Sequence, residues 1–515
     1  MTVEQRPTTG HADLRSKGLS TNSVGLLASV VLGVSSIAPV YALTATLGPT
    51  VAEVGLQMPA VFLAGFVPML LVAYAYRELN REAPDCGTSF TWTTKAFDPH
   101  VGWMCGWGAL LATIIVLSNL AGVAVSFFYL LLGEITGSAS IATLGDNTLV
   151  NVLTCVAFVA VATWVTYRGV EATKRVQYVL VGFQMAVLAV FAVLALFAVL
   201  AVAKAGDAPG RTPFDVAWLD PTAITSFSAF TAGLSLSLFI YWGWDTCLTV
   251  NEETSGSART PGRAALVTML VIIVTYLGVA IAVQVYAGVG TEGTGLGNPD
   301  TSGNVFAALA GPVMGPGLAF LLFLAVVASS ASSLQTTFLP PTRTMLAMAT
   351  YGALPRQLAE VHPRFLTPST ATLVAGGGTA AFYVGMTLIS ENVLIDTIYA
   401  LGLMICFYYG LTAFACVWWF RRDLGRSARD LVFKGVFPLL GGLVLAAVFV
   451  QTAVDTLDPA YGSGSAVFGV GSVFVIGIGL LVLGAVLMLL WRARHPEFFR
   501  GETLRRDTPA LVIDE

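Results

Sequence analysis

Two short segments of this chain combine helix-breaking residues with polar side chains inside apolar stretches. One is Gly33-Val-Ser-Ser-Ile-Ala-Pro39, with two hydroxyls and a proline, and the other is Tyr241-Trp-Gly-Trp-Asp245, with a glycine and a carboxylate. A bilayer interior offers no water to unpaired polar groups, so such residues indicate a site inside a helix bundle. A packed kink at Pro39 and a close helix contact at Gly243 are the structural alternatives for each segment taken alone.

The direction of the chain assigns a charge preference to each segment. A helix that begins near Pro39 presents free amides and the positive end of its dipole, which can hold a carboxylate. Proline suits that first position because it has no amide to leave unpaired. A helix that ends near Ile240 and Tyr241 presents carbonyl oxygens, which can accept hydrogen bonds from an ammonium group. Together the two ends fit the charges of an α-amino acid.

The candidate substrate-binding residues come from these two segments. They are Ser35, Ser36, Ile37, Ala38, Phe239, Tyr241, Trp242, Gly243 and Trp244. We expect at least one of the aromatic residues to act as a gate, with packing or lipid contact as the alternative.

Asp245 and a group of serines are candidates for ion coupling. A carboxylate deep in a span is costly unless it is paired or protonated, so Asp245 predicts a group that senses protons or substrate. Its alternative role is to cap the helix that follows. The hydroxyls of Ser329, Ser330 and Ser333 form a candidate sodium site, and tight helix packing is the alternative for them. All four histidines fall in segments expected to be cytoplasmic, which excludes a histidine proton relay.

The composition indicates the kind of structure that positions these residues. Of the 515 residues, 56% are hydrophobic and 11% are charged, whereas soluble proteins have about a quarter charged residues. Such a chain is dissolved largely in lipid and has no room for a sizeable soluble domain. About twelve membrane-spanning helices are expected, at 24-49, 57-76, 101-132, 150-166, 177-203, 226-250, 264-288, 312-338, 369-389, 393-420, 435-454 and 466-491.

The positive charges orient these spans. Of the 26 Lys and Arg residues, all but Lys204 and Arg211 fall on one set of connections, which leaves 24 on the side that holds both termini. The positive-inside rule places that side in the cytoplasm, so we expect a multi-pass plasma-membrane protein with two cytoplasmic ends. The basic residues form no patch, and the net charge of -4 gives no reason to expect a nucleic-acid partner.

The two polar segments lie in the first and sixth spans, five spans apart. Because five is odd, a repeat of that length runs in opposite directions through the membrane, which predicts two inverted five-helix repeats plus two extra helices. The expected divisions are a cytoplasmic tail at 1-23, repeats at 24-203 and 226-420, helices 11 and 12 at 435-491, and a second cytoplasmic tail at 492-515.

Soluble-enzyme motifs are missing or out of place. The chain has no G-K-[ST] phosphate loop and no H-E-x-x-H sequence, which argues against an ATP-driven pump and a zinc protease. A G-x-G-x-x-G match at Gly288-Gly293 follows a helix rather than a strand and is attributed to chance. The six cysteines form no C-x-x-C pair, so neither disulfides nor a metal site is expected. We expect no enzyme activity, no cofactor and no metal.

Three stretches resemble the amino acid-polyamine-organocation permease superfamily. Phe239-Ile-Tyr-Trp-Gly-Trp-Asp-Thr-Cys-Leu-Thr-Val-Asn-Glu-Glu253 is similar to the sixth span of cationic amino-acid transporters and of the light subunits of heteromeric transporters. Arg343-Thr-Met-Leu-Ala-Met-Ala-Thr-Tyr-Gly-Ala-Leu-Pro355 looks like the cytoplasmic loop after the eighth span, with Thr350-Tyr351 in place of the usual Arg-Asp pair. Ser35-Ser-Ile-Ala38 replaces the commoner glycine-rich break of the first span.

The resemblance implies an all-α membrane fold of the LeuT-like kind, with the substrate held at interrupted helices 1 and 6. It implies that Phe239 is the aromatic gate. Trp242 stands where the heteromeric light subunits have glycine, which implies a narrower pocket that favours small substrates. The fifth span has no lysine where some family members use one in place of sodium.

We therefore expect a secondary transporter of an amino acid or related small amine, working by alternating access as a symporter or an antiporter with H+ or Na+. A polyamine or ethanolamine-type amine permease is the alternative within transport. A membrane sensor of the same fold is the alternative outside it, although neither tail is long enough for an added sensory domain.

Overall fold

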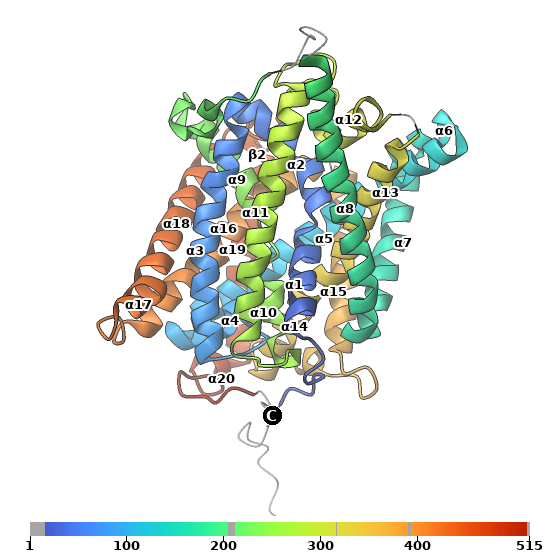
Figure 1. Ribbon diagram of the computed structural model, residues 1–515. Coiled ribbons are helices and arrows are strands. Elements are labelled where there is room, and N and C mark those ends of the chain that lie inside the picture. Colours follow the sequence, from blue (N-terminus) through green and yellow to red (C-terminus); the bar gives the residue numbers. More distant parts are fainter. Residues whose placement is uncertain (1–15, 204–211, 316, 390–392, 512–515) are drawn as a thin grey trace, which may run out of the picture.

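The computed structural model describes residues 16–203, 212–315, 317–389 and 393–511, which form a bundle of long helices with short connections (Figure 1). The longer helices are α1 (Leu26–Ile37), α2 (Pro39–Val54), α3 (Met58–Glu82), α4 (Ser89–Ala96), α5 (Pro99–Thr136), α7 (Thr148–Tyr167), α8 (Val170–Ala203), α9 (Phe227–Ile240), α11 (Thr260–Ala287), α12 (Val305–Met314), α13 (Ala319–Thr337), α14 (Leu339–Thr350), α15 (Ser369–Ile389), α16 (Val393–Phe420), α18 (Phe437–Asp455) and α19 (Ser472–Arg494). Each apolar run predicted from the sequence lies on one or two of them.

Short helices and one small hairpin complete the described residues. The short α-helices are α6 (Ala139–Ala142), α10 (Thr246–Thr249), α17 (Ala428–Asp430) and α20 (Pro496–Phe499). Single helical turns are η2 (Gly55–Gln57), η3 (Thr143–Asp146), η4 (Val216–Leu219), η5 (Pro221–Ala223), η6 (Asn251–Glu253), η7 (Ser302–Asn304), η8 (Arg356–Ala359) and the π-helical η9 (Leu431–Val436). The strands β1 (Ala466–Val467) and β2 (Val470–Gly471) pair antiparallel.

The helices confirm an integral membrane protein. Ten helical stretches among the described residues are long and apolar enough to cross a membrane. The first of them, Leu26–Glu82, holds two of the predicted spans, whereas α9 has 14 residues and falls short by this measure. The expected number of twelve therefore stays a prediction. Among the charged residues used to orient the chain, Arg6, Arg15, Lys204 and Arg211 lie outside the described residues, as does His11.

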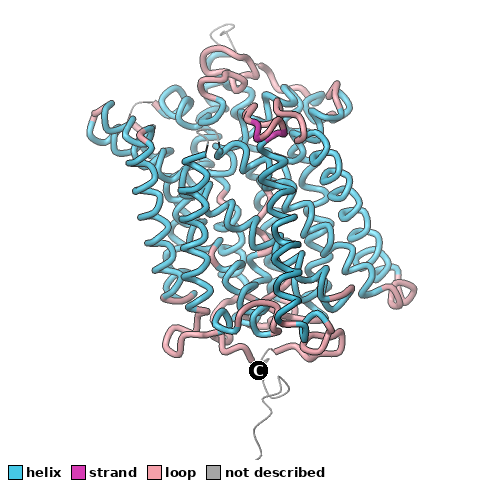
Figure 2. The backbone as a smooth tube through the Cα atoms, turned by 180° about the vertical axis from the view of Figure 1, so that it is seen from behind, coloured by secondary structure: helices cyan, strands magenta, loops and turns pink. Residues whose placement is uncertain are grey.

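Both described ends of the chain lie at one end of the bundle, together with α4, α10, α14 and α20 (Figure 1). We call this end the terminal face. The small hairpin lies at the other end, the opposite face (Figure 2).

The interior of the bundle is built around α1, α2 and α9. α1 packs against α8, α11 and α13, whereas α2 packs against α9, and α5 packs against α13 and α16. The helices α7 and α19 turn most of their side chains outward. A chain of about 20 apolar residues spans a bilayer, so the junctions of α1 with α2 and of α9 with α10 fall near the middle of the bundle.

Candidate functional site

The first span is interrupted at Ala38. This residue has the left-handed backbone conformation φ 54°, ψ 65°, and its amide donates to the carbonyls of Val34 and Ser35, which ends α1 at Ile37. Pro39 then starts α2 as its first residue, a position where a missing amide costs nothing. No side chain caps this end of α2. Its positive end therefore faces the centre of the bundle without a built-in anion.

The sixth span is interrupted after Ile240, and the two interruptions touch at Gly243. Gly243 has φ +110°, and a Cβ placed on it would lie 3.0 Å from the carbonyl carbon of Ser36 and 3.1 Å from the amide nitrogen of Ile37. Nearby, the hydroxyl of Thr246 donates to Ser36 Oγ over 2.8 Å. Glycine is needed here for its backbone conformation and for this close approach of two chains. The two segments singled out in the sequence thus form one region.

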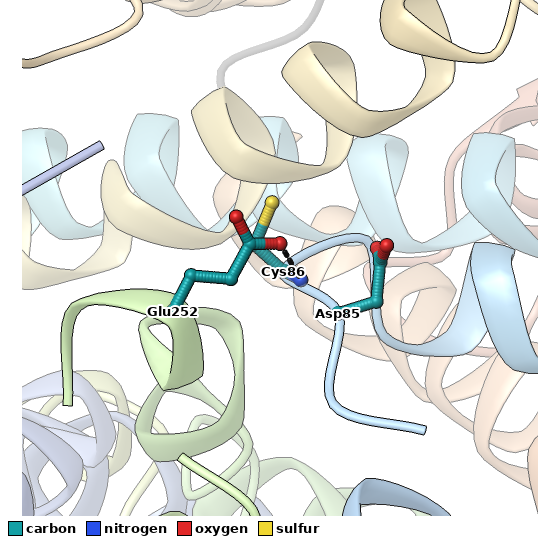
Figure 3. A group of neighbouring side chains, drawn as sticks. All are labelled: Asp85, Cys86 and Glu252. Atoms are coloured by element: carbon teal, nitrogen blue, oxygen red, sulfur yellow. Dashed lines mark hydrogen bonds between the residues drawn. The ribbon is translucent and has the colours of Figure 1, made fainter. Parts of the chain in front are cut away.

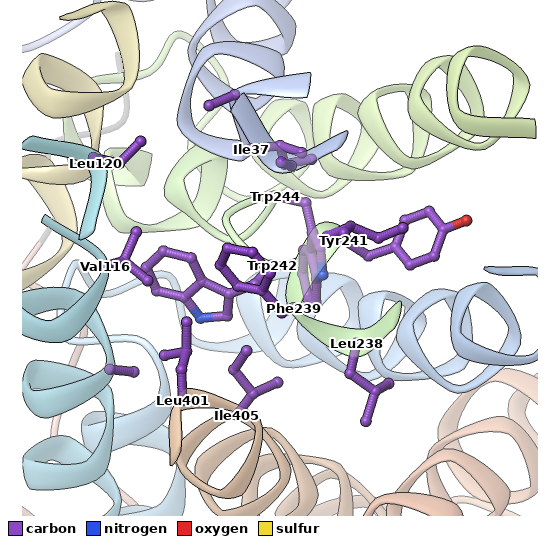
Figure 4. Close-up of a cluster of buried hydrophobic side chains, with 14 of the residues drawn as sticks. Ile37, Val116, Leu120, Leu238, Phe239, Tyr241, Trp242, Trp244, Leu401 and Ile405 are labelled. Carbon is purple, nitrogen blue, oxygen red and sulfur yellow. The ribbon is translucent and has the colours of Figure 1, made fainter. Parts of the chain in front are cut away.

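The aromatic residues of the second segment point in different directions (Figure 4). The indole of Trp242 extends between Val116 and Leu120 on one side and Leu401 and Ile405 on the other. Tyr241 points away from it, and its hydroxyl donates to the carbonyl of Phe62 over 3.0 Å. Trp242 therefore fills the centre of the bundle, while Tyr241 is a packing residue.

Phe239 and Trp244 also have separate surroundings. The ring of Phe239 meets the ring of Tyr41 edge to face, with centroids 6.2 Å apart. The ring of Trp244 packs against Tyr76 and Tyr409, at 5.0 Å and 5.2 Å between centroids. Phe239 and Tyr41 join α9 to α2, as a gate would require, whereas Trp244 belongs to an aromatic cluster with α3 and α16.

Asp245 is buried and connects to Trp242 through one phenol. Tyr408 Oη donates to Asp245 Oδ2 over 3.4 Å and accepts a hydrogen bond from the indole nitrogen of Trp242. Asp245 is the N-cap residue of α10, but its side chain makes no capping hydrogen bond. Its Oδ1 has no hydrogen-bond partner among the described residues. This geometry favours a responsive acid over a helix cap.

The serines of α13 pack against the interruption of the first span. Ser329 Oγ accepts from the amide of Tyr41 over 3.4 Å, and Ser333 Oγ donates to the carbonyl of Ser36 over 2.9 Å. Ser330 Oγ is buried without a hydrogen-bond partner in the part of the chain that the structure describes. Two of the three candidate ion-site serines therefore already bind the interrupted backbone.

A glutamine on α8 completes this polar layer, and sequence reasoning did not identify it. Gln177 Oε1 accepts from Ser35 Oγ over 2.8 Å and also from Ser332 Oγ. Its amide nitrogen donates to the carbonyl of Ser332 over 3.1 Å. Ser35 Oγ lies 2.6 Å from Ser332 Oγ. Gln177 thus joins α1, α8 and α13 with a neutral group, in the span that has no lysine.

A cavity of about 250 Å³ lies beside this centre. Its lining includes Thr44 and Ala45 of α2, Leu236 of α9 and Asn119 of α5. Along their helices these residues lie nearer the opposite face than Tyr41 and Phe239 do. The cavity therefore lies on the opposite-face side of the Tyr41–Phe239 contact. Thr44 Oγ1 is buried there without a partner among the described residues.

The terminal face is closed by a buried ion-pair cluster, which we call the latch: Lys17, Asp85, Glu252, Glu253, Arg343 and Tyr351. Lys17 Nζ lies 2.8 Å from Asp85 Oδ2 and also pairs with Glu252. Arg343 binds both carboxylate oxygens of Glu253, each over 3.0 Å. Such bidentate pairs fix geometry as well as charge. The cluster joins the segment before α1 to the α3–α4 loop, to η6 and to α14.

Further contacts hold the segment before α1 in the same place. The amides of Ser23 and Val24 donate to the carbonyl of Glu253 over 2.9 Å and 3.0 Å, and the amide of Ser255 donates to the carbonyl of Val24 over 2.9 Å. Tyr351 Oη donates to Asp85 Oδ2 over 2.7 Å. The first three of these bonds hold the segment before α1 against the residues around η6.

The charges of the latch follow from burial and pairing. Burial disfavours the charged form of Lys17, but Asp85 and Glu252 outweigh it and raise the pKa of Lys17 well above its ordinary value of 10.5. Burial likewise disfavours the Asp85 carboxylate, yet Lys17 and its hydrogen bonds lower the pKa of Asp85 below 3.8. Burial raises the pKa of Glu252 above 4.5. The single positive charge of Lys17 therefore pairs with two carboxylates of unequal pKa, those of Asp85 and Glu252.

Asp85, Cys86 and Glu252 lie close enough together to bind a metal ion, with ligand atoms within 4.8 Å of one another (Figure 3). Two observations favour the ion pair instead. The ammonium of Lys17 pairs with both carboxylates, where a metal ion would have to lie. Burial raises the pKa of the Cys86 thiol well above its ordinary value, which disfavours the thiolate that a metal needs. All six cysteines are buried and free.

Comparison with known families agrees with this geometry. Residues 24–475 match the amino acid permease family. The chain belongs to that family. The match covers both interruptions, the cavity and every latch residue except Lys17, so the resemblance to the amino acid-polyamine-organocation superfamily is confirmed for this permease.

Several curated relatives cover most of the permease. The low-affinity putrescine importer of Escherichia coli (strain K12) is 22% identical over 447 residues, covering 86% of this chain and 90% of the relative. The branched-chain amino acid permease of Bacillus subtilis (strain 168) is 24% identical over 68% of this chain and 72% of its own. The crystal structure of MhsT in complex with L-phenylalanine matches with a TM-score of 0.60 and 16% identity, over 83% of this chain and 97% of that one. The permease thus has the LeuT-like fold.

Proposed function

We propose that this permease is a secondary transporter that moves an amino acid or a related small amine across the plasma membrane by alternating access. The observation that carries the proposal is the contact at Gly243, where the interruptions after α1 and α9 meet backbone to backbone. A free helix N-terminus at Pro39 and a helix C-terminus at Ile240 supply the partners for a carboxylate and an ammonium group.

The proposal assigns roles to the residues around this contact. Ser35, Ser36, Ile37, Ala38 and Gly243 supply the backbone that binds the charged groups of the substrate. Phe239 with Tyr41 is the gate toward the opposite face, and the latch is the gate toward the terminal face. In the structure the latch is closed, and the cavity lies on the far side of the Phe239 gate. The orientation proposed from the positive charges makes the terminal face cytoplasmic. The two repeats at 24-203 and 226-420 would rock against each other around this centre.

The size of the substrate is proposed from Trp242. Its indole fills the space between α5 and α16 where the side chain of an amino acid would lie (Figure 4). A small side chain, or an amine with none, fits without moving it. The relatives are named for putrescine and for branched-chain amino acids, so an amine permease of the polyamine or ethanolamine type is the second candidate.

Coupling to protons through Asp245 is favoured over coupling to sodium. Of the candidate sodium ligands, Ser329 and Ser333 already bond to the backbone of Tyr41 and Ser36, and Ser330 alone has no partner among the described residues. A sodium ion would have to displace these bonds, whereas Asp245 has an unpartnered oxygen within the described residues. A carboxylate at this depth is costly when charged, which suits a proton carrier.

The experiment is uptake of labelled amino acids and amines by the purified permease in liposomes, after a thermal-shift screen has identified ligands that stabilise it. Gly243→Leu should abolish uptake, because its side chain meets the backbone of Ser36 and its φ of +110° disfavours any side chain. Gly278→Leu is the matched control, since a Cβ there meets nothing within 4 Å. Normal uptake by Gly243→Leu would remove the segment from the site.

A further inference from the structure

A groove on the outside of the bundle, between α7 and α15, has the features of a lipid-binding site. It has a volume of about 500 Å³. Its lining is almost wholly apolar and includes Val156, Ala160 and Trp164 of α7 and Leu373, Gly377 and Ala380 of α15. Trp164 is 57% exposed and Leu373 is 59% exposed. In a membrane protein these side chains face hydrocarbon.

Two glycines of α15 explain why the groove exists. A Cβ on Gly376 would lie 2.2 Å from Thr163 Oγ1, so the missing side chain lets the two helices approach at this level. A Cβ on the next residue, Gly377, would meet nothing within 4 Å, so its missing side chain leaves a hollow. The hydroxyl of Thr163 donates to the carbonyl of Val159 over 2.7 Å and is satisfied. The hollow therefore suits an alkyl chain.

The end of the groove nearest the terminal face is positively charged. Arg168 follows the last residue of α7, and its guanidinium lies 4.7 Å from the ring centroid of Trp164 and 5.5 Å from that of Phe365. The guanidinium of Arg364 lies 5.5 Å from the same Phe365 ring. Stacking fixes a guanidinium by its face and leaves its N–H edge free to bind an oxyanion.

These two arginines have no protein counter-ion in the described part of the chain. Both are exposed, and neither has a described carboxylate oxygen within 4.0 Å. Glu360, the described acid in the same loop as Arg364, accepts a hydrogen bond from Thr370 over 3.4 Å. An alkyl-lined groove that ends at two unpaired guanidinium groups is complementary to a lipid with a negatively charged headgroup.

We propose that this groove binds one anionic phospholipid from the leaflet at the terminal face, with an acyl chain between α7 and α15 and its phosphate on Arg168 and Arg364. The proposal does not depend on which solute the permease carries. It predicts selection by charge through the arginines and by shape through Gly377, and the two can be tested separately.

Native mass spectrometry of the delipidated full-length permease, with phosphatidylglycerol or phosphatidylcholine added, tests the charge. Wild type should retain one phosphatidylglycerol at a concentration at least tenfold lower than it needs for phosphatidylcholine. The double variant Arg168→Gln/Arg364→Gln should lose that preference. Arg421→Gln is the matched control, because its guanidinium also lies over an exposed tryptophan, 4.3 Å from the ring centroid of Trp418, but on α16. Equal retention of both lipids by wild type would overturn the proposal, as would an unchanged preference in the double variant.

A second pair of variants tests the groove. Gly377→Phe should fill the hollow and reduce retention of both lipids, whereas Gly278→Phe on α11, another exposed glycine with open space, should not. Melting temperatures of the lipid-free variants check that both are folded. Retention unaffected by Gly377→Phe would contradict the proposal. A lipid-free dimer that dissociates in Gly377→Phe would assign the groove to a second copy of the chain and would also overturn it.

Discussion

Replacement of Lys17 by methionine should open the terminal face. The substitution keeps most of the volume of the side chain but removes the single positive charge between Asp85 and Glu252. The side chain of Lys17 is fully buried, and those of Asp85 and Glu252 are 3% and 4% exposed. Two carboxylates are then left together without a cation, and removing one partner of a buried ion pair is strongly destabilising.

Protonation limits the size of the effect. The closed state of the variant can relieve the repulsion by protonating Glu252, which costs about 3.4 kcal/mol at pH 7 for a carboxyl with the ordinary pKa of 4.5. Burial already raises the pKa of Glu252, so this cost is an upper limit. It corresponds to a shift of the equilibrium between closed and open states toward open by up to roughly 300-fold.

The native cysteine Cys247 can report the opening. Its thiol is buried and donates to the carbonyl of Ser29 on α1, with 3.1 Å between the sulfur and the oxygen. In a background where the other cysteines are replaced, the alkylation rate of Cys247 measures how often α1 moves away. Lys17→Met should raise this rate by up to that factor. Lys434→Met, which removes a pair with Asp430 between η9 and α17 whose side chains are each 20% exposed, is the control and should leave the rate unchanged.

The pH dependence of closure is a second test of the latch. A carboxyl whose pKa is raised in the closed state favours closure at low pH and opposes it as the pH rises through that pKa. Lowering the pH from 7 to 5 should therefore slow alkylation more in Lys17→Met than in wild type, because Lys17 stays charged in wild type and opposes the rise in the pKa of Glu252. Adding Glu252→Gln should restore much of the closure. An unchanged alkylation rate in Lys17→Met, or an equal rise in Lys434→Met, would show that the latch does not keep the terminal face closed.

Three further predictions concern the centre. If Asp245 carries the proton, Asp245→Asn should keep substrate binding and counterflow but lose uptake driven by a pH gradient; loss of binding itself would indicate direct contact with a cationic substrate. Trp242→Gly should raise kcat/KM for large relative to small substrates by about tenfold or more, and an unchanged ratio would show that the indole does not limit size. Uptake should be equal in sodium and choline buffers, and a sodium dependence weakened by Ser330→Ala or Ser333→Ala would restore the sodium site.

The sequence alone predicted the helices and their interruptions well, because each rests on local chemistry. Long apolar runs mark the spans, and Pro39 and Gly243 mark places where a helix cannot continue without cost. α2 begins at Pro39 and α9 ends at Ile240, as expected. The family and the LeuT-like fold followed from the same stretches.

The latch was missed because its partners are far apart in sequence. Lys17 is separated by 68 residues from Asp85 and by 235 from Glu252, and no local pattern pairs them. Lys17 was counted only as a charge that orients the chain, whereas Arg343 is also the first residue of a stretch that resembles the family. Glu252, Glu253 and Tyr351 lay within stretches that resemble the family, which was a usable signal. Gln177 gave no such signal in the sequence, because a buried neutral amide has no distinctive spacing.

The directions of the aromatic side chains were also beyond the sequence. Phe239, Tyr241, Trp242 and Trp244 fall within six residues, and the backbone leaves helical geometry after Ile240. Past that point no helical period predicts which ring faces the centre. In the structure Phe239 meets Tyr41, Tyr241 bonds to the carbonyl of Phe62, Trp242 extends between α5 and α16, and Trp244 packs against Tyr76.

The single phenol between Trp242 and Asp245 would link proton binding to solute binding if Asp245 carries the proton. Tyr408 has one hydrogen to donate, and an ionised Asp245 takes it. A protonated Asp245 can donate to Tyr408 instead, which frees the phenol hydrogen for another acceptor. A solute that accepts this hydrogen would bind more tightly to the protonated permease, and by thermodynamic linkage it would raise the affinity for the proton by the same factor.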